Sequence, residues 1–127
     1  MKLVIILQHR GAIEALKQAL PANGATALRI RRAIKPLVEA LGDYNGLVEA
    51  KLKELGKTQI RGSDPEAPAV EAFLNSAAQE EVCGDVEPIL TEADLETLRV
   101  PRRDNAITGL TVAEIDSIEA LGLIKKL

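Results

Sequence analysis

The sequence predicts a mainly helical α+β protein, in which a long, kinked central helix packs with shorter helices and a small two-stranded β element. Apolar residues recur at helical spacing from residue 30 to residue 55, and residues 3–7 form a dense aliphatic run typical of a short strand. Phe73 and Tyr44 are the only aromatic residues, so Leu, Ile, Val and Ala must build the core. The 127 residues are about one domain's worth, and we expect a single domain, 1–127.

Two short elements open the chain. Residues 2–7 are predicted to form a strand because β-branched and aliphatic residues dominate this run. In residues 11–20, GAIEALKQAL, the apolar residues lie three and four apart, as in a short amphipathic helix. This helix is expected to end at Pro21, which cannot easily continue it, and a turn at Asn23-Gly24 follows.

The strongest pattern in the chain predicts a central helix over about residues 26–56. Its apolar stripe has steps of three and four and consists of Ile30, Ile34, Leu37, Leu41, Tyr44, Val48, Leu52 and Leu55. Thr26 is the expected N-cap, and Gly56 is the expected stop. Pro36 removes one backbone hydrogen bond, so we expect a kink between Arg32 and Pro36 or two helices that meet there. A helix of this length extends about 45 Å, which exceeds the needs of one small core.

The remaining elements follow a loop at residues 56–68. A helix is expected over residues 66–81, with Val70, Phe73, Leu74 and Ala77 facing inward. Residues 82–89 alternate apolar and polar, which predicts a short strand able to pair with residues 2–7. A short helix capped by Thr91 and Asp94, a loop at residues 99–109 and a final helix complete the chain; the capping box of this last helix is Thr111 with Glu114.

Charge divides the chain into a basic helical half and an acidic half. Residues 1–62 hold 11 Lys and Arg against 5 Asp and Glu, whereas residues 63–127 hold 5 against 14. Three arrangements fit this division: two halves that pair within one chain, two faces for different neighbours, or copies that associate head to tail. No apolar run is long enough to span a membrane or serve as a secretory signal, so synthesis in the cytoplasm is expected.

No pattern in the sequence predicts an enzyme, a cofactor or a metal site. The Gly-Lys-Thr of residues 56–58 lacks the earlier glycine of a phosphate loop, because Lys51 occupies that position. His9 and Cys83 are the only residues of their kinds, so a zinc site is excluded, and Cys83 is expected to be a small buried hydrophobe. The carboxylates from Asp85 to Glu96 lack the central glycine of a calcium loop and are expected to form a solvated face.

Two groups of basic residues are the candidate partner-binding residues. Arg29, Arg31, Arg32 and Lys35 form one compact patch on the predicted central helix, and Arg102 and Arg103 form a second basic spot. The first patch can pair with the carboxylates of the same chain, bind an acidic protein or a neighbouring copy, or bind nucleic acid. Nucleic acid ranks last, because the chain is net acidic, has only two aromatic residues and has no reader motif.

The order of segments resembles that of a family of small phage and prophage proteins. ALKQALP, LRIRRAIKPLVEALGDYNGLVEAKLKELG, FLNSAAQEEV, GDVEPI, LTEADLETL and LTVAEIDSIEALGLI follow one another in this order. The family's Leu-Ser-Asp-Leu-Glu type step is matched by Leu90, Thr91, Asp94, Leu95 and Glu96, whereas Pro36 and the inserted VPRRDNA depart from the family. The resemblance covers nearly the whole chain and carries no catalytic residues. It implies a phage accessory protein that binds other proteins, in the virion or during assembly.

The resulting hypothesis is a non-enzymatic phage structural or assembly protein that acts through protein–protein contacts. We expect it to self-associate or to bind phage structural proteins, in the host cytoplasm and then in the virion, with no cofactor and no membrane. The alternative is a phage-encoded inhibitor that binds a host enzyme through the basic patch or the acidic half.

Overall fold

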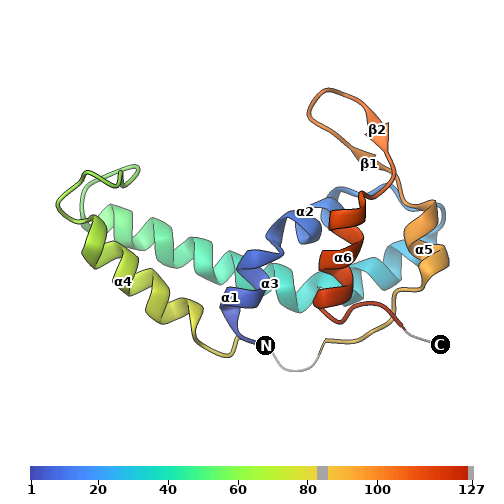
Figure 1. The fold of residues 1–127 in the computed structure, drawn as a ribbon, viewed down its shortest axis with the longest axis horizontal. Coiled ribbons are helices and arrows are strands. Elements are labelled where there is room, and N and C mark those ends of the chain that lie inside the picture. Colours follow the sequence, from blue (N-terminus) through green and yellow to red (C-terminus); the bar gives the residue numbers. More distant parts are fainter. Residues whose placement is uncertain (83–85, 126–127) are drawn as a thin grey trace.

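The computed structural model describes residues 1–82 and 86–125 and confirms a mainly helical α+β fold with one long helix and a small antiparallel sheet (Figure 1). In chain order the elements are α1 (Leu3–Gln8), α2 (Arg10–Gln18), α3 (Gly24–Glu54), α4 (Ala67–Ala78), α5 (Glu92–Thr97), β1 (Val100–Pro101), β2 (Ile107–Thr108) and α6 (Val112–Ala120). The long helix α3 runs through almost the whole length of the molecule (Figure 1).

Helix α3 is a single helix that continues through Pro36. The predicted N-cap at Thr26 is wrong, because the side chain of Asn23 accepts a hydrogen bond of 2.9 Å from the Thr26 amide, and the helix begins at Gly24. The predicted stop at Gly56 is confirmed by its φ of +66°, a left-handed conformation that a glycine adopts without strain. Within residues 1–82 and 86–125, no helix combines the length and apolar character needed to cross a membrane.

The predicted strand at residues 2–7 is wrong, because these residues form helix α1. Leu3 and Ile6, one helical turn apart, are both buried in the core, so tertiary packing overrides the β propensity of the run. The expected pairing with residues 82–89 is reduced to an isolated bridge between Lys2 and Glu81 and a hydrogen bond of 3.1 Å from the Val82 amide to the Met1 carbonyl. Residues 83–85 of that predicted strand lie outside the described residues.

The sheet is a hairpin within residues 99–109, where a loop was predicted. Val100 pairs with Thr108 and Pro101 with Ile107. Asn105 adopts a φ of +67°, and the Asp104 side chain accepts a hydrogen bond of 3.1 Å from the Ala106 amide, so the turn uses the usual chemistry of Asp and Asn. Each strand has only two residues, and one of the four is Pro101, so alternation of apolar and polar residues cannot reveal them.

The core joins α1, α2, the first half of α3, α5 and α6, which together with the hairpin we call the body. Its largest fully buried side chains are Ile6, Ile13, Leu16, Leu37, Leu90, Leu98, Val100, Ile118, Leu121 and Leu123. The predicted apolar stripe of α3 supplies Ile30, Ile34 and Leu37 to this core, and Leu41 and Tyr44 pack at its edge. The capping boxes of α5, Thr91 with Asp94, and of α6, Thr111 with Glu114, are confirmed.

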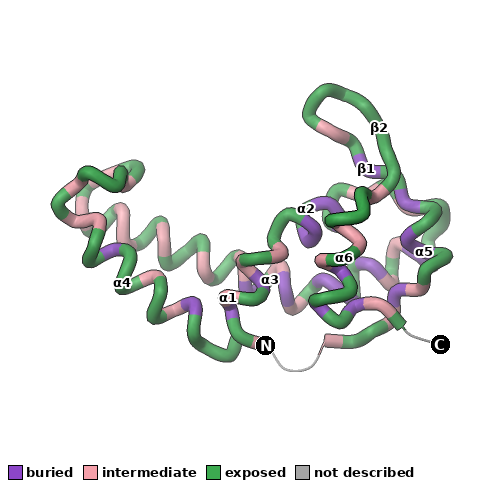
Figure 2. The backbone as a smooth tube through the Cα atoms, viewed as in Figure 1, coloured by how far each residue is buried: buried purple, intermediate pink, exposed green. Residues whose placement is uncertain are grey.

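Beyond Tyr44, α3 leaves the body and forms an arm with the connecting segment and α4. We define the arm as residues 45–80. Figure 2 shows that most buried positions lie in the body, whereas the arm is mostly exposed or half-buried. Helix α4 is held at both ends: Lys57 Nζ lies 2.8 Å from a Glu66 oxygen near the tip, and the Leu3 amide donates to the Glu80 carbonyl at 3.0 Å near the base.

Candidate functional site

Part of the basic patch of α3 forms ion pairs with carboxylates in the acidic half of the same chain. Arg29 donates from Nε and Nη2 to the two carboxylate oxygens of Asp94, at 3.0 and 2.6 Å. Arg32 Nη2 lies 3.1 Å from an oxygen of Glu87. Two of the four cations of this patch therefore pair within the chain, which was one of the three arrangements considered for the patch.

The contact between Arg29 and Asp94 is a structural link between α3 and α5. Asp94 is 4% exposed and also accepts hydrogen bonds from the Thr26 hydroxyl, at 3.2 Å, and from the Thr91 amide, at 3.1 Å. The Arg29 hydrogen bonds, aided by those of Thr91 and Thr26, hold the pKa of Asp94 well below its usual range despite the burial, which acts in the opposite direction. A carboxylate with these partners fixes the helix pair and leaves Arg29 little freedom to bind a ligand.

The other cations of the patch remain at the surface. The pair of Arg32 and Glu87 has both side chains more than half exposed, so water screens it and its contribution to stability is small. Arg31 and Lys35 are exposed, and no carboxylate among the described residues lies within ion-pair distance of either. The patch that faces solvent is therefore smaller than the sequence predicted.

The two arginines of the second basic spot, Arg102 and Arg103, lie in different environments. Arg102 forms a two-pronged contact with Glu114, at 2.9 and 2.8 Å, and also donates to Thr108 and to the Gly109 carbonyl, so it ties the hairpin to α6. These Arg102 contacts, together with the Thr111 hydrogen bonds, lower the pKa of Glu114 to about 2. Arg103 is exposed.

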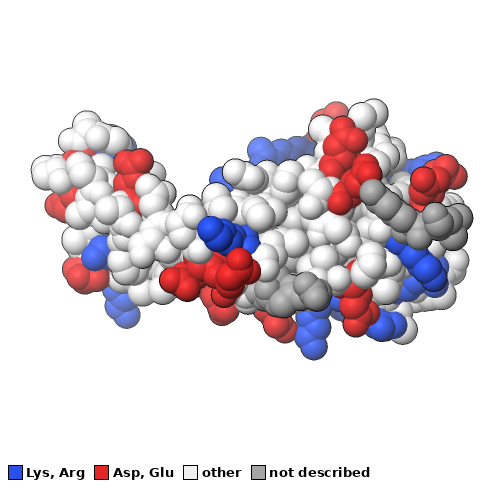
Figure 3. Space-filling view, turned by 60° about the horizontal axis from the view of Figure 1, so that its bottom comes forward, with Lys and Arg blue, Asp and Glu red and all other residues white. Residues whose placement is uncertain are grey.

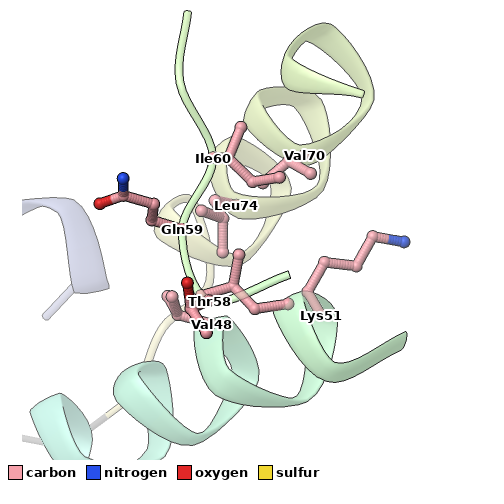
Figure 4. A pocket seen from close by; sticks show the side chains of 8 residues that line it. Val48, Lys51, Thr58, Gln59, Ile60, Val70 and Leu74 are labelled. Atoms are coloured by element: carbon pink, nitrogen blue, oxygen red, sulfur yellow. The ribbon is translucent and has the colours of Figure 1, made fainter. Parts of the chain in front are cut away.

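The arm carries an apolar groove that sequence reasoning did not identify. It has a volume of about 310 Å³ and lies between α3, the connecting segment and α4. Its walls are formed by Val48, Lys51, Leu52, Thr58, Gln59, Ile60, Val70 and Leu74. In Figure 4 the Ile60 side chain of the connecting segment lies beside the Val70 and Leu74 side chains of α4, whereas the Lys51 ammonium and the Gln59 amide point away from them.

An exposed apolar row borders this groove. Phe73 was predicted to face inward, but it is 40% exposed, as is Leu47. The Lys51 ammonium lies 4.9 Å from the centre of the Phe73 ring, and Leu47 precedes Lys51 by one helical turn on α3. Leu47 and Lys51 therefore share one face of α3, and Lys51 reaches Phe73 on α4. We call Leu47, the aliphatic stem of Lys51 and Phe73 the arm row. The apolar stripe on α3, longer than one small core needs, was a sequence signal for the groove, because Val48 and Leu52 of the stripe line it.

Other features of the chain have structural explanations. Gly56 ends α3, and Lys57 pairs with Asp64 and Glu66, so the Gly-Lys-Thr sequence begins no helix here. His9 Nδ1 lies 3.0 Å from the Ser117 hydroxyl and joins the α1–α2 junction to α6. A second hollow of about 270 Å³ lies between α2 and α3, lined by Leu7, Arg10, Gly11, Glu14, Leu41 and Asn45. Cys83 lies outside the described residues, as does Asp85 of the predicted acidic face.

Among the described residues that line the two hollows, Glu14 is the only His, Cys, Asp or Glu. Within the part of the chain that the structure describes, no three His, Cys, Asp or Glu side chains are grouped so that they could hold a metal ion. Comparison of the chain with protein-family models, with curated proteins and with solved structures found no match.

Proposed function

We propose that this protein acts by binding another protein through its arm, without catalysing a reaction. The observation that carries the proposal is the arm row beside an apolar groove, on a helix pair that projects from the body. Exposed aromatic and aliphatic side chains next to a pocket are typical of the anchors and holes of protein interfaces. The resemblance to small phage proteins supports a role in the assembly or structure of a virion.

The surface chemistry favours a protein over a nucleic acid as the partner. Of the four cations of the basic patch on α3, Arg29 and Arg32 have intrachain carboxylate partners, which leaves few free charges for phosphate contacts. The arm groove offers mainly aliphatic walls, which suit the apolar side chains of a protein segment. A steep dependence of binding on salt concentration would instead indicate nucleic acid.

Site-specific photocrosslinking in the organism of origin tests the proposal. A photoreactive amino acid replaces Phe73 in the arm or, as a matched control, Val112, which is 75% exposed at the start of α6 in the body. We expect position 73 to yield a discrete crosslinked species and position 112 to yield none. Equal crosslinking from both positions, or none from position 73, contradicts binding through the arm.

The identity of the crosslinked protein separates the two functions that the sequence raised. A phage structural protein, or the chain itself, supports assembly; a host enzyme supports an inhibitor. Mass spectrometry of the crosslinked band makes the distinction.

A further inference from the structure

We infer that the partner of the arm is a second copy of this chain, bound arm to arm about a two-fold axis with Phe73 of each copy seated in the groove of the other. The inference rests on the proposed function, because it names the partner of the same surface. Three features of the arm carry it: a projecting side chain and a recess on one surface, a mixed charge pattern and a groove that α4 leaves uncovered.

The first feature is that one surface carries both halves of a contact. In a two-fold interface the same patch meets itself, so each projecting group must find a recess on an identical surface. Phe73 projects from α4, and the groove lined by Val70 and Leu74 of that helix lies next to it. Lys51 joins the two, since it lines the groove and also covers the Phe73 ring. Two copies can therefore exchange their Phe73 rings in one contact.

The second feature is the charge pattern of the arm. Residues 45–80 hold four Lys and Arg, all between residues 51 and 61, and six Asp and Glu, four of them between residues 64 and 80. Cations and carboxylates of the arm partly pair with one another, as Lys57 does with Asp64 and Glu66. A patch of mixed sign meets its own copy without strong repulsion, whereas the basic patch on α3 would repel itself. Figure 3 shows both carboxylates and cations on the arm, at the left, separated by uncharged surface.

The third feature is the incomplete cover of the α3 stripe. Val48 and Leu52 continue the heptad-like spacing that the body covers at Ile30, Ile34 and Leu37, yet they are only half-buried although α4 packs beside them. An aliphatic stripe at this spacing is suited to packing against helices. The arm of a second copy can cover this stripe, because its own α3 and α4 present the same aliphatic side chains for packing.

Sedimentation equilibrium of the pure full-length chain over a range of concentrations tests the inference. We expect a monomer–dimer equilibrium. Phe73→Glu and, independently, Leu47→Glu should each raise the dissociation constant at least about tenfold, because each places a charge within the apolar contact. Val112→Glu, the matched control in the body, should leave the constant unchanged. Phe73 and Leu47 are each 40% exposed, so both variants should fold, and circular dichroism checks this.

A mixture of isotopically light and heavy chains tests the geometry of the contact. With the photoreactive amino acid at position 73, we expect crosslinks between light and heavy chains that end within residues 48–60 or 70–74, which line the groove. A monomer at every concentration, a Phe73→Glu variant that dimerises like the wild type, or crosslinks between chains that end in the body would each overturn the inference. If position 73 then captures a different protein in cells, only the second copy is rejected; if it captures nothing, the proposed function fails as well.

Discussion

Replacing Asp94 by Asn should destabilise the fold by about 2 kcal/mol, because it disrupts a buried carboxylate that joins α3 to α5. Asp94 accepts four hydrogen bonds, two from Arg29, one from Thr26 and one from the Thr91 amide. The Asn amide nitrogen must face at least one Arg29 donor, so one charge-assisted hydrogen bond is lost, which costs about 1.5–3 kcal/mol. Water reaches part of the Arg29 side chain, which is 37% exposed, and lowers this cost toward the middle of the range.

Urea denaturation followed by circular dichroism at neutral pH measures this loss. Glu87→Gln is the matched control, since it removes the exposed partner of Arg32 on the same face of α3 and should leave the unfolding midpoint unchanged. An Asp94→Asn protein that unfolds at the wild-type midpoint would refute the assigned role of the buried pair.

The effect of pH on this variant has a definite sign. The pKa of Asp94 is lower in the folded protein than in the unfolded chain, so the carboxylate stabilises the fold above the unfolded pKa of about 3.9. This contribution is lost as the pH falls further. The difference in stability between the wild type and Asp94→Asn should therefore be full at neutral pH and shrink below about pH 4. A difference that grows on acidification contradicts the reasoning.

Three further predictions concern the hairpin and the backbone of α3. Glu114→Gln should destabilise the fold by about 1–2 kcal/mol, because Glu114 binds Arg102 and caps α6. In urea titrations, the difference in free energy of unfolding between the wild type and this variant should shrink as the pH drops from about 4.3 toward about 2. Gly56→Ala should lower the free energy of unfolding by about 1 kcal/mol, because Gly56 has a φ of +66°. Gly42→Ala, in the helix interior with open space around it, should raise this free energy by about 0.5–1 kcal/mol. Equal effects of the two substitutions would contradict the assignment of Gly56 as the helix stop. Pro36→Ala should raise the thermal midpoint, since it restores a hydrogen-bond donor within α3; a lower midpoint in calorimetry would show that the Pro36 ring contributes more by packing.

Local chemistry accounts for the parts of the fold that could be predicted. The apolar stripe of α3, the capping boxes of α5 and α6 and the stop at Gly56 all depend on residues close together in sequence, and all are confirmed. The strand predicted at residues 2–7 failed for the opposite reason. Its aliphatic run suits a strand or a buried helix equally, and contacts with distant helices decided between them.

The candidate site was only partly visible in the sequence. Charge counts raised the pairing of the two halves as one alternative, but they did not indicate that Arg29 would meet Asp94, sixty-five positions away, or that Arg31 and Lys35 would remain in solvent. Phe73 has the spacing of an inward residue on α4, yet it borders the groove because α4 packs on α3 through a different part of its surface.

By itself, therefore, the sequence determined three features: the mainly helical character of the chain, the end of its long helix and the starts of α5 and α6. These features depend on backbone conformation and on contacts within a few residues. Only the tertiary structure decided that α1 is a helix, which cations pair within the chain and that half of α3 projects as an arm with an apolar groove. These features depend on which distant surfaces meet, and spacing along the chain does not specify the facing surface.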